Sequence, residues 1–158
     1  MLLGTGSVNL NVQNNTTLNG IDWFHLVSTY DGSESASGLK VYVNGDASSL
    51  TDNSAGSYTG MSQTGGNFEI GRFANGHSEF DGLVDEVAVF NAELSASDVG
   101  VLYGTGVPTN PTTSSLLAWW RMGDGTEAGS GTTVYDMSAN SNNGTLTNGP
   151  TYSSTVPS

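Results

Sequence analysis

The fold is decided by residues 80–91, FDGLVDEVAVFN, which are followed closely by Leu94 and Ser95. This run predicts a β-strand that is largely apolar on both faces. Side chains alternate along a strand, so Asp85 and Glu86 are expected to point to opposite faces. Burying an ionised carboxylate is costly unless it is paired or bound to a metal. The strand is therefore expected either to end at a rim or to carry a site.

The composition favours a β protein with many turns. The 158 residues suffice for one domain with a hydrophobic core. With 22 glycines and only 11% charged residues, the chain favours strands and turns over long helices. It has no cysteine, which excludes disulfides and thiolate metal sites.

The net charge and the N-terminal residues indicate which binding partners and which cellular location to expect. The net charge is −12 with three basic residues, which argues against nucleic acid and anionic membranes because both need clustered cations. The first residues have neither the charge nor the apolar run of a signal peptide, and no run is long enough for membrane insertion. If the protein works outside a cell, we expect it to leave by lysis or as part of a particle.

Regular apolar runs separated by turns predict an all-β fold, an antiparallel β-sandwich with one short helix. Asn44-Gly45 is the strongest hairpin signal, because a type I′ turn needs positive φ at both central positions. Residues 95–98, SASD, resemble a capping box and predict a helix through Tyr103, which Gly104 ends. Strands are expected around 8–12 and at 23–30, 39–43, 67–73, 80–91, 116–122, 132–138 and 144–147, with a loop at 74–78.

Several motifs, in a fixed order, resemble the C-terminal half of laminin G-like domains. They are WFHLV at 23–27, YDG at 30–32, VYVNG at 41–45, IGR at 70–72 and the run that begins at residue 80. The resemblance spans about residues 20–104 and implies the jelly-roll β-sandwich of the concanavalin A-like lectin/glucanase superfamily. The later motifs LLAWWRM at 116–122, VYDMS at 134–138 and NNGTL at 142–146 look like the N-terminal half of the same domain type.

The two halves therefore stand in permuted order. Residues 1–106 are expected to form the C-terminal-half-like part, 107–115 a linker, and 116–158 the N-terminal-half-like part of the same or a neighbouring sandwich. Circular permutation fits because domain termini often lie close together. Strand exchange with another subunit fits because an incomplete sandwich exposes edges that a partner can pair. The third explanation is a piece of a longer array of such domains.

The resemblance also implies a function. Laminin G-like domains bind glycans or proteins, often with calcium, in extracellular or surface proteins. This Asn/Gly/Thr-rich chain is also similar to domains of bacteriophage tail fibres and other virion proteins. We expect a protein of the virion surface or extracellular space that adheres to a host-surface glycan. The alternative is a capsid or tail decoration protein, which cements other subunits without binding sugar. The expected partners are assembly subunits, including copies of itself with exchanged strands, and a glycan.

The same resemblance implies a structural calcium site between a loop of the second half and the strand at 80–91. Calcium takes six to eight oxygen ligands from carboxylates, amides and carbonyls. Alternatively, the loop residues make turns through Asx hydrogen bonds, and the strand's acid pairs with Arg72 or Arg121. The residues expected to hold the ion are Asp85, Asp136, Asn140 and Asn142.

Enzymatic activity is not expected, although glucanases share the superfamily. Retaining hydrolysis needs two carboxyl groups about 5–5.5 Å apart. Asp81 and Asp85 share a strand face but are separated by about 13 Å. Glu79 and Asp81 are spaced at about 6.6 Å, but they sit in a Gly/Asn-rich loop without a complete motif. No catalytic residue is therefore assigned.

The aromatic residues are expected mainly in the core. Trp119 and Trp120 point to opposite faces of one strand, and we expect at least one of them, with Trp23, to be packed inside. Sugar sites in sandwiches usually come from loops or a concave face. The candidate ligand-binding residues are Asp31, Tyr58, Asn75 and His77.

Overall fold

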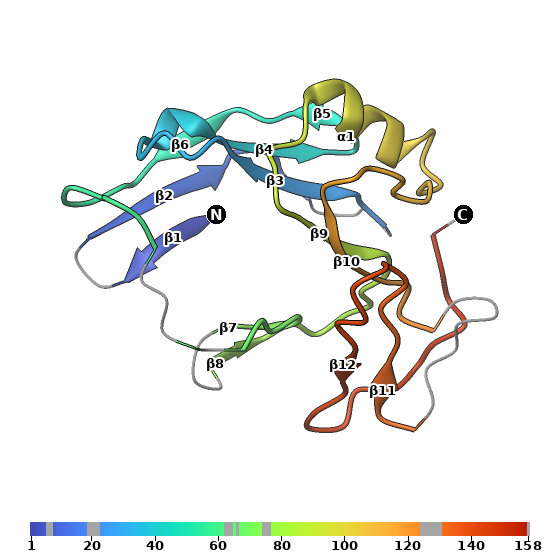
Figure 1. Ribbon diagram of the computed structural model, residues 1–158. Coiled ribbons are helices and arrows are strands. Elements are labelled where there is room, and N and C mark those ends of the chain that lie inside the picture. The colour runs from blue at the N-terminus through green and yellow to red at the C-terminus, as the bar shows by residue number, and fades with distance from the viewer. Residues whose placement is uncertain are drawn as a thin grey trace. The chain divides into compact units, whose positions relative to one another are not determined.

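The computed structural model describes residues 1–5, 8–18, 23–61, 65, 67–73, 77–123 and 131–157. These residues build β-strands, one short α-helix and one turn of 3-10 helix (Figure 1). The mostly β character with a single short helix is confirmed. The first unit consists of Met1–Ser62, Ala92–Asn110 and Pro157–Ser158, and the second of Gln63–Asn91 and Pro111–Val156. No helix in the described residues is long and apolar enough to cross a membrane.

The first unit contains two antiparallel three-stranded sheets. One has the order β1-β2-β6, from β1 (Leu2–Thr5), β2 (Val8–Asn14) and β6 (Leu50–Asp52). The other has the order β3-β4-β5, from β3 (Leu26–Tyr30), β4 (Leu39–Val43) and β5 (Asp46–Ala47). The predicted Asn44-Gly45 turn joins β4 to β5 with φ of 52° and 83°, as a type I′ hairpin requires.

The core of the first unit combines side chains of both sheets. Alternating residues of β2, Leu10 and Val12, pack with alternating residues of β4, Leu39 and Val41, and with Tyr58. β2 buries side chains at period two, whereas β4 also buries Tyr42 on its other face. Backbone hydrogen bonds from the Ser48 N–H to the Val41 carbonyl and from the Asn15 N–H to the Ser49 carbonyl connect the two sheets.

The helix α1 (Ala96–Tyr103) begins and ends where the sequence predicts. The Ser95 hydroxyl accepts a hydrogen bond from the backbone N–H of Asp98 at 3.2 Å. The Asp98 carboxylate in turn accepts one from the backbone N–H of Ser95 at 3.0 Å, which completes the capping box. Gly104 ends the helix at φ 61°, and Val99 anchors it as a fully buried side chain.

The second unit is built from three two-stranded antiparallel sheets. They pair β7 (Arg72–Phe73) with β8 (His77–Glu79), β9 (Val87–Phe90) with β10 (Leu116–Trp120), and β11 (Thr133–Val134) with β12 (Gly144–Thr145). Its core contains Ala118 and Trp120 of β10 with Val134. Trp119 is equally buried, and Trp23 is partly buried. The prediction that at least one residue of the Trp119–Trp120 pair is packed inside is confirmed.

The pairing of β9 with β10 joins the two predicted halves of the sequence. Val87 pairs with Trp120, and Val89 with Ala118. The two strands belong to segments on either side of the predicted linker, and they run side by side in Figure 1. The chain's own second half therefore supplies the neighbour of its most family-typical strand.

Several predicted strands are shorter in the structure because left-handed residues interrupt them. The strand predicted at 80–91 is confined to Val87–Phe90, since Glu86 adopts φ 51°. The opposite-face assignment of Asp85 and Glu86 is therefore wrong, because it assumed extended backbone at both. Gly71, at φ 78°, precedes β7, and Met122, at φ 55°, follows β10.

Other boundaries also need correction. The strand predicted at 23–30 begins at Leu26, that at 132–138 is limited to Thr133–Val134, and that at 144–147 to Gly144–Thr145. His77 and Ser78, predicted in a loop, belong to β8 because the chain turns back to pair His77 with Phe73. The sequence pattern does not indicate β1, β5 or β6.

Candidate functional site

An open pocket of about 450 Å³ lies in the first unit. This volume is within the usual range of about 300–1,000 Å³ for ligand sites. The pocket has an apolar floor and a polar rim of two hydroxyls and one carboxylate. Its lining residues are Val12, Ala36, Ser37, Leu39, Ser48, Leu50 and Asp52.

Strand register brings these residues together. In the β2–β6 ladder Val12 lies directly opposite Asp52. Leu50 and Asp52 are two residues apart on β6 and therefore share a face. The 3-10 helix η1 (Ala36–Gly38) supplies Ala36 and Ser37 immediately before β4 begins at Leu39. Three stretches of chain, at residue 12, at 36–39 and at 48–52, thus build one concave surface.

The rim is polar and carries a negative charge. Asp52 accepts a hydrogen bond from the backbone N–H of Ser54 at 2.8 Å. The Ser54 hydroxyl and backbone N–H lower the pKa of Asp52 below its usual value, so the carboxylate is ionised at neutral pH. The Ser48 hydroxyl lies 3.4 Å from that of Thr16, and the Ser37 hydroxyl 2.9 Å from that of Ser35. Both rim hydroxyls are able to donate or accept.

The predicted ligand-binding residues Asp31 and Tyr58 lie close to this pocket but do not line it. Asp31 is exposed and packs tightly against Gly38, the last residue of η1. Tyr58 is 7% exposed and packs in the core with Leu39 and Val12. Their ligand roles stay predictions, although burial leaves the Tyr58 ring little surface for a sugar. His77 lies in β8 of the second unit, and Asn75 falls outside the described residues.

A second cluster centres on Glu86 in the second unit. Its carboxylate accepts a hydrogen bond from the Trp119 indole Nε1 at 2.6 Å and one from Arg121 Nε at 2.9 Å. The guanidinium carbon of Arg121 lies 5.6 Å from the Trp119 ring centroid. Glu86 and Arg121 side chains are 17% and 26% exposed, so the ion pair is largely shielded from water.

This cluster is the main feature that sequence reasoning missed. Arg121, one of the two arginines considered as partners for Asp85, forms an ion pair with Glu86. One carboxylate oxygen of Asp85 accepts the backbone N–H of Glu86 at 3.0 Å. A usable signal was present, because Trp119 and Arg121 are two residues apart and so share a face in an extended segment.

Asp136 is the most heavily hydrogen-bonded carboxylate among the predicted metal ligands. One oxygen accepts from the backbone N–H groups of Trp119 at 2.9 Å and Ser138 at 2.8 Å. The other accepts from the Ser138 hydroxyl at 2.8 Å and the Asn142 N–H at 2.7 Å. Burial acts to raise the pKa of Asp136, but these hydrogen bonds outweigh it and hold the pKa below its usual value.

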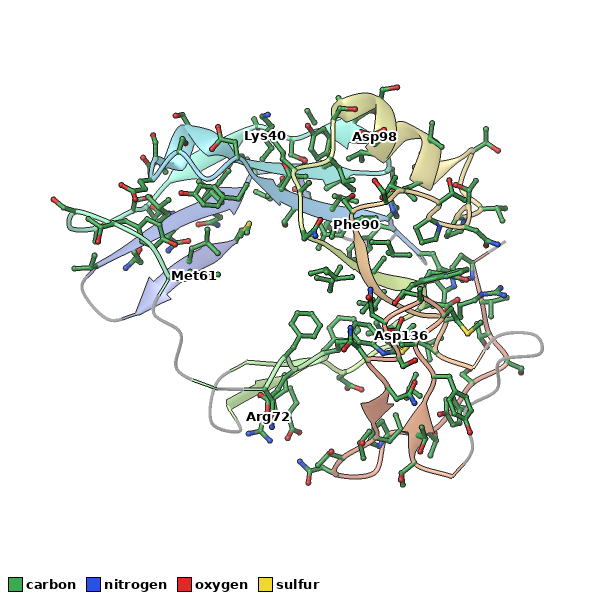
Figure 2. All side chains as sticks on the ribbon, viewed as in Figure 1. Lys40, Met61, Arg72, Phe90, Asp98 and Asp136 are labelled. Atoms are coloured by element: carbon green, nitrogen blue, oxygen red, sulfur yellow. The ribbon has the colours of Figure 1, made fainter. Side chains whose placement is uncertain are left out.

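The structure brings Asp136, Asn140 and Asn142 together beside β10 (Figure 2 labels Asp136). Asn140 and Asn142 each donate a side-chain N–H to the Leu117 carbonyl at 2.9 Å. The bond from the Ser138 N–H to Asp136 is the local Asx hydrogen bond of the alternative interpretation, whereas the two asparagine contacts are long-range. They tie the loop to β10 through backbone groups.

Asp85 and Asp136 belong to segments on opposite edges of β10. Trp120 pairs with Val87 of β9 on one side and bridges Asp136 on the other. In the described part of the chain, no group of three or more His, Asp or Glu side chains is arranged to hold a metal ion. The calcium site stays a prediction.

Comparison with known proteins identifies the class. The mostly β fold is that of a lectin-like domain, and a laminin G-like family model, described as the concanavalin A-like lectin/glucanases superfamily, matches residues 2–100. The chain therefore belongs to this superfamily. The match covers every residue that lines the pocket, together with Glu86, and ends within α1. No curated protein and no solved structure matches the chain significantly.

Proposed function

We propose that this protein is a lectin-like surface module of a virion or extracellular assembly, which adheres to a glycan of a host surface. The pocket of the first unit carries the proposal, because it lies within the region that belongs to a lectin superfamily. A sugar ring presents both apolar C–H faces and hydroxyls. The partly exposed Ala36 and Leu50 of the lining suit the former, and the polar rim suits the latter.

Binding without hydrolysis is the accompanying proposal. A retaining glycosidase needs two carboxyl groups about 5–5.5 Å apart. Among the described residues that line the pocket, Asp52 is the single carboxylate. This composition supports recognition of a sugar rather than cleavage of a glycosidic bond.

A glycan array, followed by titration of the bound glycans, tests the proposal. Ser37→Trp fills the pocket from its exposed rim, so we expect it to abolish saturable binding. Ser49→Trp is the matched control, because Ser49 is exposed and lies outside the pocket lining. Failure of the wild-type protein to bind any glycan overturns the proposal, as does equal loss of binding in both variants.

For the topology, we propose a jelly-roll sandwich in which permuted halves are joined within one chain. The in-chain pairing of Val87 with Trp120 supports permutation. Strand exchange between subunits would produce the same pairing between two chains. Light scattering distinguishes permutation within one chain from strand exchange between two. A monomer at all concentrations excludes strand exchange, and a dimer that separates only on unfolding supports it.

A calcium ion at Asp136, Asn140 and Asn142 also remains a proposal. Binding there would have to replace hydrogen bonds that Asp136 now accepts. Thermal unfolding with calcium or with a chelator provides the test. A melting temperature raised by calcium in the wild type but not in Asp136→Asn supports the site, and an unchanged wild-type temperature overturns it.

The second candidate function is that of a decoration protein that cements a capsid or tail. It is favoured by large exposed apolar side chains in the second unit, namely Phe68, Phe80 and Leu83 at 66%, 55% and 47% exposure. Such side chains often mark surfaces that partners cover. Loss of assembly stability in Leu83→Ser, without any glycan binding by the wild type, would favour this function.

A further inference from the structure

We infer that the pocket of the first unit selects uncharged saccharides and rejects glycans whose bound ring carries a carboxylate or sulfate. The inference rests on the proposed glycan-binding function and specifies its ligand class. It follows from the charge that lines the pocket and from the positions of the basic groups within the first unit.

The pocket holds a negative charge without a compensating cation in its lining. Asp52 is its one ionisable residue, and the remaining lining groups are apolar side chains and the hydroxyls of Ser37 and Ser48. The Ser54 N–H at 2.8 Å and the Ser54 hydroxyl hold the Asp52 carboxylate in its ionised form. A second anion placed in this pocket would meet an ionised carboxylate at short range and repel it.

Lys40 is the single lysine or arginine of the first unit, and it is held away from the pocket. It follows Leu39 directly on β4, so its side chain points to the opposite face from that pocket residue. Figure 2 labels Lys40. There its ammonium forms an ion pair with Glu93 at 2.6 Å. Lys40 therefore neither neutralises Asp52 nor offers a partner to an anionic sugar.

The two other groups of the first unit that can carry a positive charge, the N-terminus and His25, do not line the pocket either. The amino group of Met1 donates to the Val12 carbonyl at 2.8 Å from the β1 side of β2, whereas Asp52 lies on the β6 side. His25 stacks on Tyr103 of α1, and burial lowers its pKa so that it is neutral at pH 7. Arg72 and Arg121 belong to the second unit, where they pair with Glu69 and Glu86.

A neutral sugar can form favourable contacts with the groups that line the pocket. An ionised carboxylate accepts hydrogen bonds from sugar hydroxyls, and serine hydroxyls complete the set because they donate and accept. The C–H face of the ring covers the partly exposed side chains of Ala36 and Leu50. Discrimination therefore arises from an unfavourable contact with the anion as well as from favourable contacts with the neutral ring.

The test compares matched glycans on one array, with each neutral oligosaccharide beside its sialylated and sulfated forms. We expect the wild-type protein to bind the neutral members at least about tenfold more tightly at physiological salt, where the Debye length is about 8 Å. Asp52→Asn removes the charge and retains an oxygen for the Ser54 N–H. We expect this variant to reduce the preference about tenfold. Asp46→Asn changes the net charge equally but lies on β5, outside the lining, and is expected to leave the preference unchanged.

The outcomes separate this inference from the function on which it rests. Equal or tighter binding of acidic glycans by the wild type overturns the charge selection and leaves glycan binding standing. So does an equal effect of Asp52→Asn and Asp46→Asn, which would assign the preference to the net charge of the protein. If no glycan of either kind binds, both the inference and the proposed function fail. Thermal melts of both variants confirm that each is folded.

Discussion

Glu86 accepts the indole N–H of Trp119 at 2.6 Å, across the pairing of β9 with β10. The two residues come from the two predicted halves of the chain. Arg121 Nε donates to the other oxygen of the same carboxylate at 2.9 Å, so both oxygens have a partner from the second half. A residue at φ 51° therefore orients a charged side chain that helps to join the halves.

Glu86→Ala is expected to lower the free energy of unfolding by about 2 kcal/mol, since it removes two hydrogen bonds of a charged group and leaves Arg121 without this partner. Urea unfolding measures the change. Glu93→Ala is the control, because it breaks the more exposed ion pair with Lys40 and is expected to cost clearly less. Equal losses in the two variants would contradict a larger stabilising contribution from Glu86 than from the exposed Glu93–Lys40 ion pair.

The pKa of Asp136 makes the second unit sensitive to acid. The folded pKa is below the unfolded value, so the unfolded chain binds more protons in this range. The ionised Asp136 contributes its full stabilisation above its unfolded pKa, about 3.9. This contribution is lost as the pH falls through the pKa of Asp136 in the folded protein. We expect the melting temperature of the wild type to fall more steeply than that of Asp136→Asn between about pH 5 and pH 2. Parallel pH profiles would contradict this assignment.

Gly38 has too little room for a side chain. A Cβ added there overlaps the Asp31 carboxylate and the Ser33 hydroxyl. Gly38→Ala is therefore expected to lower the free energy of unfolding by about 1–3 kcal/mol through overpacking. Because the obstacle is chiefly a side chain, the double variant Asp31→Ala, Gly38→Ala is expected to recover much of the loss. Additive losses in a double-mutant cycle would place the strain elsewhere.

Two glycines of the α1 region are expected to respond to alanine with opposite signs. Gly100 lies within the helix and has nothing within 4 Å of an added Cβ, so Gly100→Ala should stabilise the protein by about 0.5–1 kcal/mol. Gly104 has φ 61°, and a Cβ there would lie 2.6 Å from the Val107 carbonyl oxygen. Gly104→Ala should destabilise by more than about 1 kcal/mol. Thermal unfolding of the two variants in the same buffer measures both changes, and a shift of the same sign would be inconsistent with these local geometries.

Local signals in the sequence predict local structure well in this chain. The Asn44-Gly45 hairpin, the Ser95–Asp98 capping box and the Gly104 terminus all appear as expected, because each depends on hydrogen bonds and φ values within a few residues. The laminin G-like assignment was also accessible, since it depends on the order of short motifs. Strand lengths were less accessible, because isolated left-handed residues such as Glu86 and Met122 carry no strong local signal.

The sequence by itself determined the class of this protein: a mostly β, strongly acidic member of a lectin superfamily with one short capped helix. Tertiary structure alone decided which acids serve which purpose. Glu86 became the partner of Trp119 and Arg121, Asp136 accepted N–H and O–H donors from residues beside β10, and Asp52 came to line a pocket with Val12. The physical reason is that a carboxylate is governed by the donors and charges around it, and in this fold strand pairing brings Trp119 and Arg121 to these acids from distant parts of the chain.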